Sequence, residues 1–169
     1  MSSNSSKSSP QVKSTPRSLI PVLSTSLNVG MALGGYIMTI PFENREYPGP
    51  AIALWFNDFF TPGFIGVTTL GVLTLTSGFR AFRIRKDVGS SQDQANAKAA
   101  SRWALAGLAF TVIHFGFGNT VLAIMDRILA NPELAQPEMA SWTSMHIVRT
   151  LTTDVPAWLC FVKALLSEI

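Results

Sequence analysis

Two long stretches of the chain, residues 18–41 and 62–78, carry no charged side chain. Each stretch is apolar around the whole helix, whereas a helix on the surface of a soluble protein keeps a polar face. The composition points the same way, because 47% of the residues are hydrophobic and only 14% are charged. About 20 consecutive apolar residues cross a hydrocarbon core about 30 Å thick, so these stretches predict helices surrounded by lipid or by other helices.

The pattern predicts an all-α membrane fold, a bundle of four transmembrane helices that occupies residues 17–169. The expected spans, each long enough to cross a bilayer with some tilt, cover about residues 18–40, 62–81, 103–128 and 140–166. Residues 1–16 are rich in serine and hold few apolar side chains, so we expect a disordered tail there. We expect an integral protein of the endoplasmic reticulum or another endomembrane, whose glycine-bearing helix faces pack within the bundle or against a second copy of the chain.

Lysine and arginine residues concentrate on one side of this predicted topology. The other side, formed by the first and third loops, holds Arg45 and Arg127 among several acidic residues. Because cytosolic segments carry the excess of Lys and Arg, we expect both termini and the middle loop in the cytosol. The basic residues of these cytosolic segments are Lys7, Lys13, Arg17, Arg80, Arg83, Arg85, Lys86, Lys98, Arg102 and Lys163.

The segment between the first two spans is short and aromatic. It begins near residue 47 and holds Trp55, Phe56, Phe59 and Phe60. It is too short to cross a bilayer by itself, and aromatic side chains concentrate at membrane interfaces. We therefore expect these rings at the outer interface, either as an ordinary aromatic belt or as a short helix that covers the mouth of the bundle over a lipophilic substrate.

Four polar side chains lie inside the predicted third and fourth spans: His114, Asn119, His146 and Arg149. An ionisable group at the centre of a spanning helix costs about 2.5–3.5 kcal/mol, so such groups face the interior of a bundle and find partners there. At about 1.5 Å per residue, Asn119, His146 and Arg149 lie at similar depths below the outer surface. The sequence predicts that these three meet in one pocket, with interhelical hydrogen bonding alone as the alternative for each.

The fourth span also carries a regular stripe of side chains. Trp142, His146, Arg149 and Thr153 follow the i, i+4, i+7, i+11 spacing that puts residues on one face of a helix. Because lipid cannot accept Arg149, this face is expected to point into the bundle. Asp154 comes five residues after Arg149, about 140° around an α-helix, so we expect it to find its partner on another helix.

Several kinds of chemistry are excluded by what the sequence lacks. Cys160 is the single cysteine, so the chain forms no intramolecular disulfide and no cysteine-based zinc site. There is no glycine-rich phosphate loop, no His-Glu-x-x-His metal motif and no Gly-x-Ser-x-Gly elbow. We expect no metal site, although a haem held between His114 and His146 is geometrically possible. Topology explains the basic residues, so no nucleic-acid partner is expected.

Three short motifs resemble the DUF1772 family of small membrane proteins, which includes the fungal anthrone oxygenases. Residues 142–158, with His146 and then Arg149 three residues later, are similar to the closing helix of that family. Residues 110–122 are similar to its third helix, and residues 34–41 to its small-residue helix that ends in Ile-Pro or Val-Pro. The resemblance covers most of the predicted membrane domain and implies the same four-span fold.

The resemblance implies an enzyme that oxidises an anthrone-type aromatic polyketide to a quinone in secondary-metabolite biosynthesis, with O₂ as co-substrate and no cofactor. An anthrone loses its benzylic proton readily, because the resulting anthrolate is aromatic and is easily oxidised by O₂. The protein then needs to bind a flat apolar ring system, remove one proton and stabilise an oxyanion. In this reading His146 is the base, Arg149 stabilises the anthrolate, and Asn119 donates a hydrogen bond to a phenol or carbonyl oxygen.

Further residues complete the predicted site. Trp142 and Trp55 are expected to stack on the substrate rings, and His114 is a second candidate base. Thr153 is expected to share the face of Arg149. The expected partners are a lipophilic aromatic small molecule and membrane lipid.

Two other functions stay open at this point. A membrane cyclase or isomerase acting on a terpenoid or polyketide needs an acid instead of O₂, and Asp154 or Glu43 supplies one. A non-catalytic four-span scaffold or assembly protein needs neither, and predicts that substitutions in the polar stripe damage stability or assembly rather than turnover. Consumption of O₂ separates the oxygenase from both.

Overall fold

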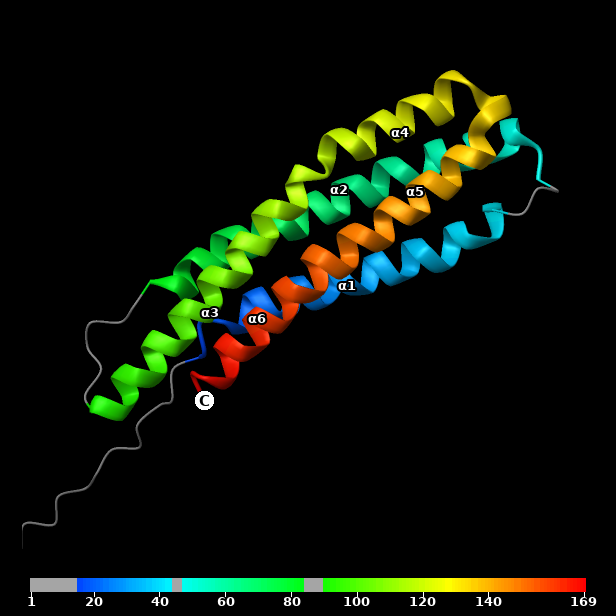
Figure 1. The fold of residues 1–169 in the computed structure, drawn as a ribbon. Coiled ribbons are helices and arrows are strands. Elements are labelled where there is room, and N and C mark those ends of the chain that lie inside the picture. The colour runs from blue at the N-terminus through cyan, green and yellow to red at the C-terminus, as the bar shows by residue number, and fades with distance from the viewer. Residues whose placement is uncertain (1–14, 44–46, 84–89) are drawn as a thin grey trace, which may run out of the picture.

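The computed structural model describes residues 15–43, 47–83 and 90–169. In this part of the chain we find helices and no strand, and the helices line up as four long rods packed side by side (Figure 1). The described rods are α1 (Leu19–Thr39), α2 (Gly49–Phe82), α3 (Ser91–Gly116) continued by α4 (Gly118–Ala130), and α5 (Ala135–Arg149) continued by α6 (Val155–Leu166). Short 3-10 turns follow α1 at Ile40–Glu43 and precede α5 at Pro132–Leu134. The predicted tail, residues 1–16, lies outside the described residues except for its last two.

Three of the helical segments are long and apolar enough to cross a membrane: Leu19–Glu43, Gly49–Phe82 and Ser91–Ala130. Their outward faces carry large apolar side chains that no other part of the described chain covers, such as Leu27, Ile37 and Ile65. Surfaces of this kind belong in hydrocarbon rather than in water. The last rod, α5 with α6, is interrupted by a π-helical turn and carries buried charged residues, and it is not among the three. That the chain crosses the membrane four times therefore stays a prediction.

Three of the helices begin before the spans that the sequence predicts. The second helix does not begin at residue 62, because the aromatic segment forms its first turns and the helix runs through Pro62 without a break. A proline removes one N–H from the helix ladder but does not by itself end a helix whose neighbours hold it in place. The third rod begins at Ser91, where the side chain of Ser90 accepts a hydrogen bond from the backbone N–H of Asp93 and caps it. The last rod begins at Ala135 rather than at residue 140.

The start of α1, the end of α2, the start of α3 and the C-terminus lie at the same end of the bundle (Figure 1). The Ser18 hydroxyl donates to Glu168 at 2.7 Å, and Nη1 of Arg17 donates to the carbonyl of Arg83 at 3.0 Å. The rods therefore alternate in direction, and the described basic residues Arg17, Arg80 and Arg83 lie at this end of the bundle. Four others of the predicted cytosolic set lie outside the described residues: Lys7, Lys13, Arg85 and Lys86.

The described residues form two cores in the bundle. An aromatic core lies where the first turns of α2 meet α4 and α5, with Phe56, Ile128 and Trp142 among its members. A second core lies between α2, α3 and α6, where Phe161 is fully buried among small residues, including Ala104 and Ala164. Phe56 and Phe60, which the sequence predicts at the outer interface, are both buried in the aromatic core. They face α5 because the helix continues through residue 62 and turns this face inward.

Candidate functional site

A cavity of about 260 Å³ lies between α1 and α2 at the level of the polar stripe of α5. Glycine creates much of its space, because no described atom lies within 4 Å of where a Cβ would stand at Gly34 or Gly63. Its rim includes Met38 and Phe64, which are 53% and 44% exposed on the apolar outer face of the bundle. The cavity therefore opens sideways onto the face that suits lipid. Its lining residues are Met31, Ala32, Gly34, Gly35, Met38, Phe59, Phe60, Gly63, Phe64, Val67, Val121, Trp142, His146 and Arg149.

The polar wall of the cavity is formed by three residues of α5. The rings of Trp142 and His146 are stacked, with centroids 4.6 Å apart and planes 12° apart. Nε2 of His146 lies 2.8 Å from the carbonyl oxygen of Ala32, and its Nδ1 lies 3.0 Å from Nη2 of Arg149. A carbonyl only accepts and a guanidinium only donates, so His146 carries its proton on Nε2 and accepts on Nδ1. In this arrangement the one lone pair of His146 holds Arg149 and is not free to take a substrate proton.

A second polar group lies next to this wall and joins three rods. Oδ1 of Asp154 lies 2.6 Å from Nδ1 of His114 on α3 and accepts from Nδ2 of Asn28 on α1 at 3.1 Å. Its other oxygen, Oδ2, lies 3.8 Å from Nε of Arg149. Asp154 and Arg149 are both buried, with 4% and 8% of their surfaces exposed. The carboxylate therefore balances the guanidinium charge. Either charge alone would be costly to bury in an apolar interior.

A π-helical turn at Thr150–Asp154 brings Arg149 and Asp154 together. In an α-helix residues five apart point in different directions, whereas i→i+5 bonding places them one above the other. Here the backbone N–H of Val155 donates to the carbonyl of Thr150, which is this π-type bond. The prediction that Asp154 needs a partner on another helix is confirmed by His114 and Asn28. The α-helical angle of about 140° between Arg149 and Asp154 does not apply here, because the π-helical turn is wider and brings the two residues together as well.

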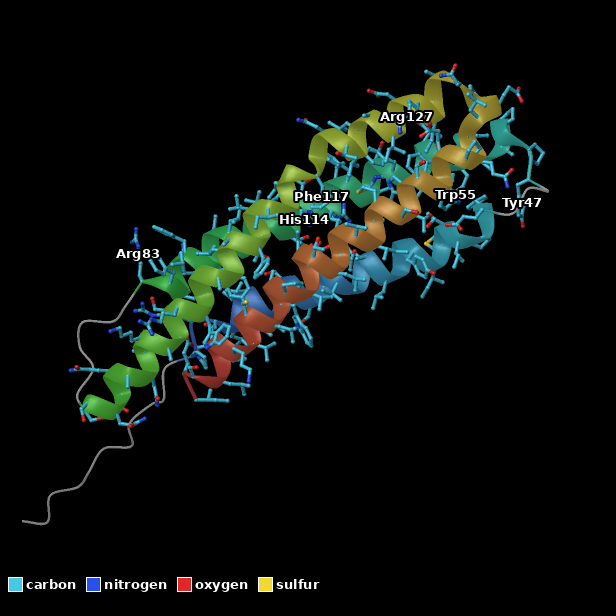
Figure 2. All side chains as sticks on the ribbon, viewed as in Figure 1. Tyr47, Trp55, Arg83, His114, Phe117 and Arg127 are labelled. Carbon is cyan, nitrogen blue, oxygen red and sulfur yellow. The ribbon has the colours of Figure 1, made fainter. Side chains whose placement is uncertain are left out.

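The structure brings some of the predicted site residues together and separates others. Trp142, His146 and Arg149 line the cavity. Thr153 is buried one turn below, where its hydroxyl donates to the carbonyl of Arg149 at 2.6 Å. His114 lies in the neighbouring polar group and outside the cavity, and Figure 2 shows it where α3 approaches its break before Phe117.

Two further predicted residues, Asn119 and Trp55, do not reach the cavity either. Asn119 is exposed, because it precedes Val121, the buried residue of α4, by two positions or about 200° around the helix. The expectation that Asn119 meets His146 and Arg149 in one pocket is therefore wrong. Trp55 stacks on Phe59 with ring centroids 4.7 Å apart and planes 12° apart, and its ring centroid lies 4.3 Å from that of Phe42. Trp55 therefore supports Phe59, which lines the cavity, but does not line the cavity itself. In this structure it cannot stack on a substrate bound there.

Sequence reasoning missed two features of the site. Asn28 carries no distinguishing pattern, and only packing of α1 against α6 and the π-helical turn before it identifies Asn28 as a partner of Asp154. The cavity itself depends on Gly34 and Gly63, which the sequence presents as helix-packing glycines. Their spacing gives no sign of whether another helix covers them. Within the described residues, no group of three or more His, Cys, Asp or Glu side chains is arranged to hold a metal ion.

The chemistry available at the cavity is that of a buried cation beside an apolar, aromatic chamber. The guanidinium of Arg149 is held on one side by His146 and balanced on the other by Asp154. Its Nε has no hydrogen-bond partner among the described residues, and neither has Oδ2 of Asp154. A fixed cation in a water-poor chamber stabilises negative charge that develops on a bound substrate or on reduced oxygen.

Three curated fungal proteins are similar to part of the chain. Epoxidase pydX of Acremonium sp. is 35% identical over 81 residues, and the probable epoxidase scpX of Mollisia scopiformis is 35% identical over 85 residues. Epoxidase gkaX of Penicillium citrinum is 32% identical over 79 residues. The matches cover 46%, 47% and 46% of this chain and 49%, 51% and 49% of the respective relatives. The chain thus spans about half the length of the curated relatives it matches.

No protein-family model matches the chain, and no solved structure matches it. The resemblance to the DUF1772 family therefore stays a prediction. The relatives are named epoxidases, which agrees with an oxidative enzyme and does not name an anthrone as substrate.

Proposed function

We propose that this chain is a membrane-embedded oxygenase that transfers oxygen to an unsaturated, apolar small molecule bound in the cavity between α1 and α2. One observation carries the proposal: a chamber of about 260 Å³ with apolar and aromatic walls has the buried Arg149 on one side. Similarity to three proteins named epoxidase supports the oxidative class. In this proposal four rods cross the bilayer, with the basic end of the bundle in the cytosol.

Epoxidation of an alkene is the reaction that the similarity favours. The alkene takes one oxygen atom of O₂, and the other atom leaves as water after two electrons and two protons are supplied by a reductant. A membrane reductase using a reduced nicotinamide is the class of donor that this step requires. Arg149 would stabilise the negative charge on the reduced oxygen, and Trp142 with the Phe59 and Phe60 rings would hold the substrate.

Oxidation of an anthrone is the second candidate, and the position of Arg149 favours it. The reaction consumes one O₂ per anthrone and yields one quinone and one water, so it needs no external reductant and no cofactor. Arg149 would stabilise the anthrolate oxygen. For His146 to act as the base, its Nδ1 must first release Arg149, so this route requires the guanidinium to move toward the substrate or toward Asp154, 3.8 Å away.

The two reactions are separated by their requirement for electrons. Membranes of yeast that express the full chain are supplied with ¹⁸O₂ and either emodin anthrone or a panel of apolar polyenes, with and without NADPH. Epoxidation predicts ¹⁸O-labelled epoxide from a polyene only with NADPH. Anthrone oxidation predicts labelled quinone and O₂ uptake without it. If neither substrate class gives labelled product above the background of control membranes, the oxygenase proposal fails and the cyclase, isomerase or scaffold functions take its place.

A matched pair of variants tests whether the cavity is the site. Gly34 and Gly30 lie four residues apart on α1, and at both a Cβ meets no described atom within 4 Å. Gly34 lines the cavity and Gly30 does not. We expect Gly34→Leu to lower product formation at least tenfold, because its side chain fills the chamber, while Gly30→Leu stays within twofold of the wild type. Equal activity of the two variants would place the reaction elsewhere.

A further inference from the structure

We propose that the basic end of the bundle holds an anionic phospholipid, with the phosphate at Arg17, Arg80 and Arg83 and one acyl chain in the groove between α2 and α3. This site is separate from the oxygenase cavity, and it stands whether or not the proposed reaction is right. Its ligand is a membrane lipid with a net negative headgroup, such as a phosphatidylserine.

The groove is a large apolar surface feature. It encloses about 930 Å³, and its walls include Phe79 of α2 and Leu108 and Val112 of α3. Along α2 it runs from Leu75 to Arg83, a rise of about 12 Å at about 1.5 Å per residue. It therefore reaches from the arginines into the apolar band of the bundle, which is the direction an acyl chain takes from its headgroup.

The three arginines gather at the end of this groove. Arg80 and Arg83 line the groove and also a second hollow of about 500 Å³ on the other side of α2, where they are joined by Arg17. Nη1 of Arg17 donates to the carbonyl of Arg83 at 3.0 Å, so the two residues are held next to each other. Figure 2 shows Arg83 where α2 ends. The Arg83 guanidinium lies 4.6 Å from the centroid of the Phe79 ring, which orients its side chain along the groove.

The charge of this cluster has no partner in the described part of the chain. None of the three arginines forms a salt bridge there. The carboxylate of Glu168, which is close to Arg17 in the chain fold, receives its hydrogen bonds from Ser18. Guanidinium groups bind phosphate oxygens through paired N–H donors, and each basic residue near a membrane surface adds about 1 kcal/mol toward an anionic lipid. The apolar groove suits the acyl chain of a phospholipid, and the arginines without a carboxylate partner suit its phosphate.

The test is native mass spectrometry of the full chain purified in detergent, titrated with dioleoyl phosphatidylserine and, separately, dioleoyl phosphatidylcholine. We expect the anionic lipid to bind the wild type in preference. We expect Arg80→Gln/Arg83→Gln to weaken that binding about 25-fold, or about fivefold for each arginine. Arg102→Gln is the matched control, since Arg102 is an exposed arginine of α3 that lines neither hollow, and it should bind as the wild type does.

Two further variants test the two parts of the site, the charge of the arginines and the apolar groove. Arg80→Lys/Arg83→Lys retains the charge and should retain most of the binding even if the glutamine variant folds poorly. Ala109→Phe fills the groove and should weaken lipid binding without changing the response to inorganic phosphate. Equal binding of the two lipids, or the same loss in Arg102→Gln, would overturn the site. Displacement of the lipid by millimolar inorganic phosphate would show a simple anion site and overturn the acyl-chain groove.

Discussion

The half of the bundle around α5 and the half around α6 are packed by opposite means. Around α6, glycine and alanine let the helices approach closely, and the ring of Phe161 fills the space between them. A Cβ added at Gly107 would lie 2.8 Å from the Phe161 ring. Around α5, aromatic rings pack against one another, as in the edge contact of Phe56 with Trp142, whose ring centroids are 5.7 Å apart. The cavity lies beside the half around α5, between α1 and α2.

The difference follows from how helices associate in lipid. Apolar side chains gain little by leaving hydrocarbon for a protein core, so close van der Waals contact between small residues holds the rods together. Aromatic rings are rigid and leave gaps that a flat ligand can fill. The half around α6 therefore serves the fold, and the half around α5 leaves room for function. Asp154 and Arg149 lie at the border of the two.

The largest effect is expected for Asp154→Asn, which removes the charge at this border. Arg149 is then left as a buried cation without a counter-charge, and loss of one partner of a buried ion pair costs about 3–5 kcal/mol. The free energy of unfolding of the purified protein, measured by denaturant titration in mixed micelles, checks this. A cost below about 1 kcal/mol would mean that the carboxylate does not compensate the guanidinium.

A smaller loss is expected for Gly107→Ala in the tightly packed half. The added methyl group must displace the ring of Phe161, and overpacking of this kind costs about 1–3 kcal/mol. Gly30→Ala is the control, because the added group meets no described atom within 4 Å. The same titration applies to both variants, and the combination of Gly107→Ala with Phe161→Leu should recover part of the loss. If the two alanine variants unfold alike, close approach at Gly107 does not hold the rods together.

Trp142→Phe probes the aromatic half and should be tolerated better. It removes the stack on His146, while a ring of similar character remains against Phe56. Aromatic pairs contribute about 0.5–1.5 kcal/mol, and the indole N–H that is lost has no hydrogen-bond partner among the described residues. We expect a destabilisation within that range by the same titration, together with weaker substrate binding. A larger cost than that of Gly107→Ala would remove the distinction between the two halves.

The smallest effect is expected for Glu138→Gln, at the outer end of the aromatic half. Glu138 accepts from Nε of Arg127 at 2.8 Å, and the Arg127 side chain, labelled in Figure 2, is 49% exposed. Solvent-exposed ion pairs contribute about 0–1 kcal/mol, and salt screens them. Unfolding measured at low and high salt should show little difference between this variant and the wild type. A loss comparable to that of Asp154→Asn would contradict the argument that burial sets the size of these effects.

The long helices were predictable from the sequence because charge-free stretches leave few alternatives. The first span, expected at residues 18–40, is α1 at Leu19–Thr39. The start of α2 was not predictable in the same way. The proline at position 62 and the aromatic run before it are typical of an interfacial segment, and only their contact with α5 shows that they continue the helix.

The stripe of Trp142, His146 and Arg149 was predictable because an arginine among apolar residues has to face the bundle interior. Asn119 was misassigned because counting residues gives the depth of a side chain along a helix but not the direction in which it points. Direction around the helix depends on what lies beside it, and there is a break at Phe117 between the two helices of that rod.

The sequence by itself determined that the chain is helical, that lipid suits its outer faces and that a cation is buried in its last rod. These properties depend on composition and on the spacing of residues along one helix. Tertiary structure decided which groups meet the cation, that a π-helical turn brings Asp154 to it, and that Gly34 and Gly63 border a cavity instead of another helix. These depend on contacts between rods far apart in sequence, and periodicity along one helix carries no information about them.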